Sequence, residues 1–120
     1  MPHLTIEYSP GVLQETDLES TLRNVNASLL ASGAIQRESD LKSRIVLRDV
    51  IRIGTGEGSR GFVYAQLRIL PGRTPQVRSD LSARIAAVLR EHCQRPPGMT
   101  VQLSVEIAEM EKESYIKEVL

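Results

Sequence analysis

The chain is short of cysteine and of aromatic side chains, and it carries no net charge. Its 120 residues include one cysteine, three tyrosines, one phenylalanine and no tryptophan. A single cysteine cannot form an internal disulfide, which excludes a disulfide-stapled scaffold. Few aromatic residues argue against a surface that stacks the bases of single-stranded nucleic acid. The 15 basic residues are balanced by 15 acidic ones, whereas nucleic-acid-binding domains usually carry a basic excess.

Long apolar runs are missing as well. No segment is apolar enough to cross a membrane, and residues 1–7 lack the basic and apolar regions of a secretory signal. We therefore expect a cytoplasmic protein with neither a membrane partner nor a nucleic-acid partner. The length suits a single domain, residues 1–120, with one modest core. A net charge of zero favours self-association.

Hydrophobic periodicity predicts four strands and two helices. Strands are predicted over residues 2–8, 43–51, 62–70 and 100–108, where apolar residues alternate or β-branched residues gather. Each helix is predicted from an apolar stripe at helical spacing. The first stripe is Leu18, Leu22, Val25, Leu29 and Leu30. The second stripe is Val77, Leu81, Ile85, Val88 and Leu89.

Turn and capping residues mark the ends of these helices. Thr16 and Glu19 have the spacing of a capping box at the start of the first helix, and Gly33 suits its C-terminal cap. Thr74 suits the N-cap of the second helix. The glycines of residues 54–61 fit the letters of a dinucleotide-binding motif, but a strand is predicted after them instead of the helix that such a motif opens. We interpret this segment as a hairpin loop.

The predicted fold class is α+β, with two β-α-β units that form a four-stranded mixed sheet. The similar halves span residues 2–51 and 62–110, and right-handed crossovers place both helices on one face. Parallel strand pairs seldom leave a face open to water, so we favour burial of the other face against further copies of the chain. That face is predicted to carry Thr5, Glu7, Arg44, Arg48, Tyr64, Gln66, Arg68, Gln102, Ser104 and Glu106.

Pro2 stands out as the candidate for chemistry, and no metal-ligating cluster is apparent among His3, His92 and Cys93. The initiator methionine is normally removed before a small residue, which leaves an N-terminal proline. A free α-amine titrates at about 7.7–8.0. Burial and neighbouring arginines lower its pKa toward neutrality, which suits a general base. The alternative interpretation is a proline that only ends an edge strand.

Short motifs along the whole chain, in their order and spacing, resemble the tautomerase superfamily, whose members act through an N-terminal proline on a β-α-β unit. Within it, the chain is most similar to the carboxymethyl-hydroxymuconate isomerases, which fuse two such units. The motifs that match these isomerases are Pro2-His3 with Glu7, Val25-Asn26, Ala31-Ser-Gly33, Ser43-Arg44, the strand from Phe62, and Gly72-Arg73. In the second half, the segments Leu70 to Val77 and Thr100 to Met110 resemble the oxalocrotonate tautomerases of the same superfamily.

The resemblance implies a trimeric isomerase that interconverts enol and keto forms of a small unsaturated oxo-carboxylate, 5-carboxymethyl-2-hydroxymuconate, without a cofactor or metal. It implies that Pro2 moves the proton and that Arg73, Arg44 and Lys42 hold carboxylates. Lys42 stands where the related isomerases carry an arginine, so the bidentate fork is lost. Ser104 replaces an arginine in the second half, so we expect one site per chain.

Two alternatives remain at this point. Another activity of the superfamily, such as dehalogenation or hydration, would use the same fold on a different substrate. A non-catalytic trimeric interaction module would use neither the proline nor the arginines. Loss of Met1 separates the enzymes from the module, because an amide nitrogen at Pro2 cannot accept a proton.

Overall fold

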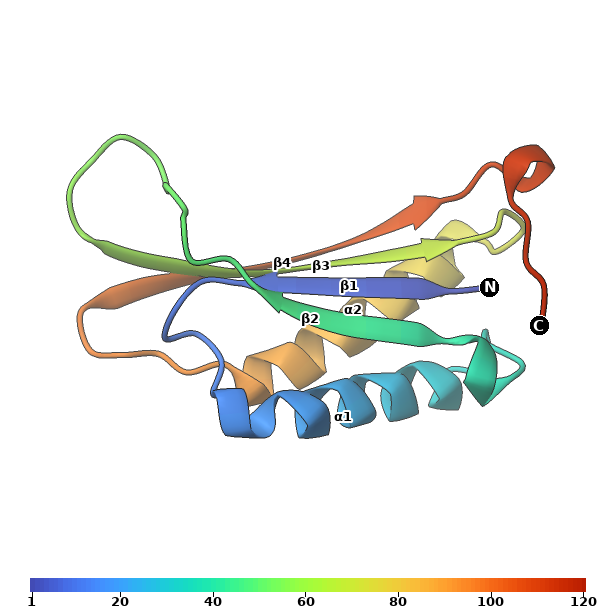
Figure 1. The fold of residues 1–120 in the computed structure, drawn as a ribbon, viewed down its shortest axis with the longest axis horizontal. Coiled ribbons are helices and arrows are strands. Elements are labelled where there is room, and N and C mark those ends of the chain that lie inside the picture. Colours follow the sequence, from blue (N-terminus) through green and yellow to red (C-terminus); the bar gives the residue numbers. More distant parts are fainter.

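A central strand, β1 (His3–Tyr8), organises the sheet. A computed structural model describes residues 1–120 of the chain. β1 pairs in parallel with β2 (Lys42–Leu47) and antiparallel with β3 (Ser59–Ile69), and β3 pairs in parallel with β4 (Met99–Glu109). The strand order is therefore β2-β1-β3-β4 (Figure 1). The two parallel pairs meet at the antiparallel contact between β1 and β3.

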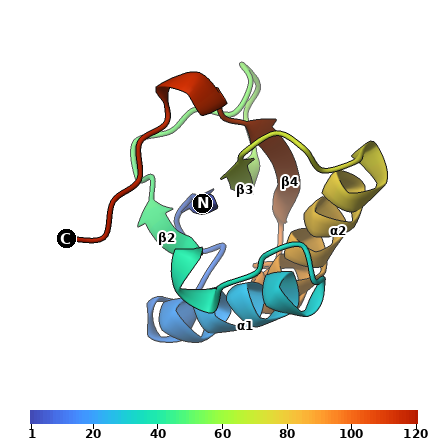
Figure 2. The same cartoon turned by 90° about the vertical axis from the view of Figure 1, so that its right-hand side faces the viewer.

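Two helices cover one face of this sheet. α1 (Leu18–Ala31) connects β1 to β2, and α2 (Pro75–His92) connects β3 to β4 (Figures 1 and 2). Three short 3-10 helices occupy Glu15–Asp17, Glu38–Asp40 and Lys112–Ser114. The predicted α+β fold, a four-stranded mixed sheet with both helices on one face, is confirmed. Neither helix has the length and hydropathy needed to span a bilayer.

The core lies between the helices and the covered face of the sheet. Alternate residues of the central strands are fully buried, and so are residues one turn apart on each helix. Burying a large aliphatic side chain stabilises the fold by about 1.5–3 kcal/mol. The fully buried core side chains include Leu4, Ile6, Val25, Leu29, Val63, Leu67, Leu81, Ile85 and Leu89. The predicted stripes therefore fall on the faces that pack.

Two predictions about the connections are wrong. β2 ends at Leu47, earlier than predicted, and β1 lies between β2 and β3. Residues 48–58 therefore form a long loop that passes the end of β1 (Figure 1), and they do not form a hairpin between paired strands. Gly61 lies inside β3, where a Cβ atom would come within 2.8 Å of Val12 Cγ2. Close packing of Val12 against β3 therefore explains why a glycine is found at position 61.

The predicted capping box is also wrong, whereas the other two caps are present. Asp17 is the N-cap of α1, and its carboxylate accepts a hydrogen bond from His92 Nδ1 (2.7 Å) instead of capping a helix N–H. This contact joins the start of α1 to the end of α2. Thr74 accepts a hydrogen bond from the Val77 N–H (3.2 Å), and Gly33 has a φ of 77° past the end of α1.

The uncovered face of the sheet is polar and carries charges of both signs, as predicted. Tyr64 Oη and Gln66 Nε2 both donate to Glu106 Oε1, at 2.7 and 2.6 Å. Arg48 pairs with Glu7 at 3.2 Å. These partners come from neighbouring strands or, for Arg48, from the residue that follows β2, so the side chains of the face hydrogen-bond to one another across the sheet.

Candidate active site

Pro2 and Arg73 line one pocket at the N-terminal end of β1. The pocket has a volume of about 150 Å³, and its other lining residues are Met1, Ile35, Gln36 and Asp40. β1 carries Pro2 to this point, the segment between α1 and β2 forms one wall, and the turn after β3 supplies Arg73. Pro2 is buried. Pro2 and Arg73, which were both predicted as site residues from the sequence, therefore lie next to the same pocket.

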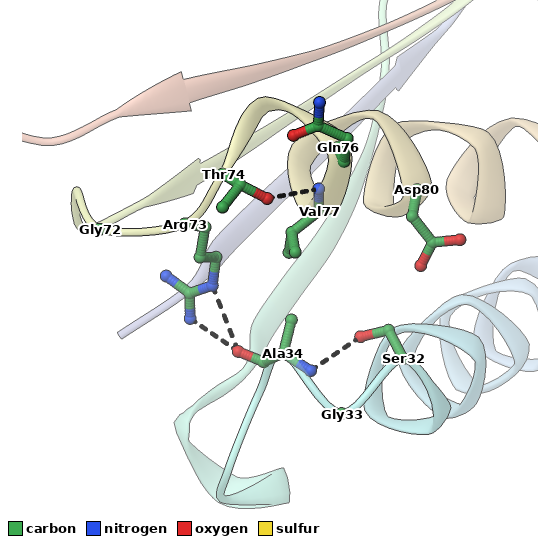
Figure 3. A pocket seen from close by; sticks show the side chains of 9 residues that line it. All are labelled: Ser32, Gly33, Ala34, Gly72, Arg73, Thr74, Gln76, Val77 and Asp80. Carbon is green, nitrogen blue, oxygen red and sulfur yellow. Dashed lines mark hydrogen bonds between the residues drawn. The ribbon is translucent and has the colours of Figure 1, made fainter.

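Arg73 is fixed by backbone carbonyls. Its Nε and Nη2 atoms donate to the carbonyl oxygen of Ala34 at 3.2 and 2.8 Å (Figure 3), and Nη1 donates to that of Leu70 at 3.3 Å. A guanidinium has five N–H donors, so two remain for an anion. These hydrogen bonds fix the orientation of the Arg73 side chain. They also hold the loop after α1 against the turn before α2.

A larger hollow of about 570 Å³ lies on the other side of Arg73, between the end of α1 and the start of α2 (Figure 3). Two of its polar side chains are engaged with the backbone. Ser32 Oγ accepts from the Ala34 N–H at 3.1 Å, and Thr74 caps α2. We place the candidate active site in the smaller pocket, because only that pocket contains the N-terminus.

The remaining predicted site residues lie outside the pocket lining. The Lys42 N–H donates to the Pro2 carbonyl at 3.1 Å, and Lys42 Nζ donates to the carbonyl oxygen of Asp40, so Lys42 borders the pocket. Arg44 lies on the polar face of the sheet, where its Nη2 atom is 3.3 Å from His3 Nδ1. The structure thus brings Pro2, Arg73 and Lys42 together at this end of the sheet and places Arg44 two residues further along β2, outside the pocket lining.

Charges around the terminus act in opposite directions. Burial and the Arg73 guanidinium lower the pKa of the terminal amino group, here that of Met1, from its ordinary value of 8.0. Lys42 and Lys117 add to this effect, whereas the Asp40 carboxylate opposes it. Burial, followed by Lys42 and Arg44, also lowers the pKa of His3. An excess of positive charge is what lowers an amine pKa and what attracts a carboxylate.

Sequence reasoning missed three of the groups that surround this site. Asp40 lies in the pocket itself. From the C-terminal tail, Lys117 contacts Asp40, and Tyr115 contacts His3, the residue that follows Pro2. Asp40 has a weak signal, since it lies two residues before Lys42. The tail residues have none, because their partners are more than seventy positions away in the chain. No group of three or more His, Cys, Asp or Glu side chains is arranged to hold a metal ion.

This fold, with Pro2 and Arg73 in one pocket, is that of the tautomerase superfamily. The chain belongs to the 5-carboxymethyl-2-hydroxymuconate isomerase family, whose model matches residues 2–119. It is therefore an enzyme of the isomerase class. Family membership favours the enzyme over the non-catalytic module that the sequence had left open.

Individual relatives agree with this assignment. The 5-carboxymethyl-2-hydroxymuconate Delta-isomerase of Escherichia coli is 26% identical over 92 residues, which cover 77% of this chain and 72% of that protein. The crystal structure of a 5-carboxymethyl-2-hydroxymuconate isomerase from Deinococcus radiodurans R1 superposes with a TM-score of 0.81 at 30% identity, covering 98% of this chain and 88% of that one. A macrophage migration inhibitory factor-like protein from Entamoeba histolytica shares the fold alone, with a TM-score of 0.66 at 14% identity over 98% of this chain and 95% of that one.

The contacts of Arg73 predict a structural cost that Arg44 does not share. Arg73→Ala removes three hydrogen bonds to carbonyl oxygens, and we expect it to lower the free energy of unfolding by about 1–3 kcal/mol. Arg44→Ala removes one long contact on an exposed side chain and should change stability by less than about 0.5 kcal/mol. Urea denaturation at one fixed protein concentration measures both. Equal stability of the two variants would contradict this view of Arg73.

Proposed function

We propose that this enzyme isomerises 5-carboxymethyl-2-hydroxymuconate, with the amine of Pro2 as the acid–base group. The observation that carries the proposal is the pocket shared by Pro2 and Arg73, where burial and the guanidinium lower the pKa of the terminal amino group, which in this structure is that of Met1. The substrate is taken from the family to which the chain belongs. An amine with a pKa near the working pH is suited to both removing and returning a proton.

Loss of Met1 is required by this chemistry for two reasons. While Met1 is present, the nitrogen of Pro2 is an amide and has no basic lone pair. Met1 also lines the pocket, so its removal enlarges the space beside Arg73. The amine is then that of a buried residue, with Arg73, Lys42, Lys117 and Asp40 as its charged neighbours.

The proton transfer needs no other reactant. The unprotonated Pro2 amine takes a proton from the enol substrate, and the negative charge that develops on the conjugated dienolate is stabilised by the two free N–H donors of Arg73. The protonated amine then returns the proton to a different atom of the conjugated system. The product has the same composition as the substrate, and the amine recovers its starting form.

The substrate carries three carboxylates, two from muconate and one from the carboxymethyl group. Arg73 is the cation in the pocket, and Lys42 borders it. Arg44 lies on the polar face beside His3, where it is suited to the most distant carboxylate. Lysine offers a point charge instead of a planar fork, so the contact of Lys42 is the least directional of the three.

The uncovered sheet face supports a proposed assembly of several chains. That face presents charges of both signs over parallel strand pairs, which are usually covered in proteins. We expect three chains to pack these faces together, which is the assembly that the resemblance to the superfamily implies. Light scattering of the purified protein should give about three times the chain mass of 13.3 kDa. A monomer at micromolar concentration would contradict this assembly.

The central role of Pro2 predicts the effect of blocking its nitrogen. We expect the mass of the active protein to lack one methionine residue. A variant with residues added before Pro2 should lose activity about 10²-fold or more, because the amide cannot accept a proton, although it keeps the fold. The kcat/KM of the processed enzyme should fall as pH decreases through the amine pKa, with a midpoint below the ordinary value of about 8.

The matched control for this experiment is Pro2→Ala, which keeps a free terminal amine in a more flexible residue and should retain part of the activity. Circular dichroism and light scattering of all three proteins separate a chemical defect from a folding defect. If the extended variant turned over the substrate as fast as the processed enzyme, Pro2 would not be the base.

A further inference from the structure

The C-terminal tail, residues 110–120, returns to the end of the sheet where the N-terminus lies. Met110 is buried, and its N–H donates to the carbonyl oxygen of Ile69 at 2.7 Å, which fixes the start of the tail beside β3. After the 3-10 helix Lys112–Ser114, the chain runs around the N-terminus on the uncovered side of the sheet, from the β3–β4 side toward the β2 edge (Figure 2). The tail therefore comes close to the Pro2 pocket, where it contacts the lining residue Asp40.

Two side chains attach the tail there. Tyr115 Oη lies 3.0 Å from Nε2 of His3, the residue that follows Pro2. Lys117 Nζ lies 2.9 Å from Oδ1 of Asp40. The ion pair is partly shielded, since the side chains of Lys117 and Asp40 are 27% and 16% exposed. Such a pair is screened by salt less than one on the open surface.

Asp40 would by itself oppose the chemistry of the pocket. Its carboxylate shares the pocket with Pro2 and Arg73, and a nearby carboxylate stabilises the ammonium form of an amine. The same negative charge repels a substrate that binds through carboxylates. A pocket built for an anion therefore needs this charge to be balanced.

Lys117 is the cation placed to balance it. Arg73 directs three of its N–H groups to the carbonyls of Ala34 and Leu70, and Lys42 Nζ donates to the backbone of Asp40 instead of its carboxylate. Lys117 is the residue whose hydrogen bond, together with the charges of Lys42 and Arg37, keeps the pKa of Asp40 below its ordinary value.

We propose that Lys117 is a positioning residue of the active site, which pairs with Asp40 and so keeps the pocket receptive to an anionic substrate. This inference rests on the proposed function of Pro2. The tail then has a catalytic purpose without touching the substrate. It places the positive charge of Lys117 next to Asp40, a residue 77 positions earlier in the sequence.

The test is the pH dependence of kcat/KM for Lys117→Met, a change that removes the charge and keeps the length of the side chain. Besides burial, the charges of Arg73, Lys42 and Lys117 lower the pKa of the terminal amino group, that of Met1 in this structure, and Asp40 raises it. Loss of Lys117 leaves Asp40 unbalanced, so we expect the midpoint to move upward by about 0.5–1 pH unit. We also expect KM for the tricarboxylate substrate to rise about threefold to tenfold, through the repulsion by Asp40.

Three further variants make the result specific. Lys117→Arg should restore the wild-type midpoint, because it restores the charge. Lys112→Met removes a cation from the exposed part of the same tail and should leave the profile unchanged. In an Asp40→Asn background, no carboxylate remains for Lys117 to balance. We therefore expect Lys117→Met to raise the midpoint by less than it does when Asp40 is present, and to leave KM nearly unchanged.

The outcomes separate this inference from the proposed function. A wild-type midpoint that tracks the terminal amine, together with an unchanged profile in Lys117→Met, would overturn the role of Lys117 and leave Pro2 as the base. Equal effects of Lys117→Met and Lys112→Met would also overturn it, since the tail would then act through general charge. Full activity of the variant extended before Pro2 would remove the proposed function itself.

Discussion

The pairing of β1 on both of its edges is the constraint on which the rest of the molecule depends. Because β1 lies between β2 and β3, its first residue is hydrogen-bonded into the sheet almost immediately after the chain begins. Leu4 and Ile6 are fully buried beneath the helices. A chain terminus usually frays, whereas this one is fixed within a residue of Pro2. The same pairing sets Lys42 opposite His3 and brings the segment that carries Asp40 to the terminus.

In the proposed mechanism, the chemistry of the site is a balance of charges around one amine. Arg73 is oriented by the carbonyls of Ala34 and Leu70, so its charge faces the terminus without the entropy cost of ordering a free side chain. Asp40 opposes that charge, and the tail supplies a compensating cation at Lys117. Burial and the positive field lower the amine pKa, and the same field would attract a carboxylate, so in the proposed mechanism binding and proton transfer depend on the same residues.

Much of the fold was predictable because its signals are local. The alternation in β1 and the stripes on α1 and α2 follow from which side chains must be buried, and these patterns repeat within a few residues. The order of the strands is not local, so a loop between two predicted strands was taken for a hairpin although β1 separates them. The capping box failed for a related reason, since the Asp17 carboxylate is used by His92, a residue from the other half of the chain.

The site was also predictable only where its signals are local. Pro2, Arg73, Arg44 and Lys42 came from motifs, and the structure gathers all of them but Arg44 at the pocket. The partners that tune the site are contacts between distant segments, such as Lys117 with Asp40, and no periodicity in the sequence encodes them. The single-domain and duplicated organisation of residues 1–120 stays a prediction.

The most direct test of this account is a titration of the terminal amine itself. The processed protein can be labelled with ¹⁵N-proline, and among its six prolines only Pro2 would carry a nitrogen that titrates. We expect the amine to titrate below its ordinary value of about 8, at the same pH as the midpoint of kcat/KM. An amine that titrates at or above that ordinary value, or a kinetic midpoint that does not follow it, would contradict the claim that Pro2 is the base.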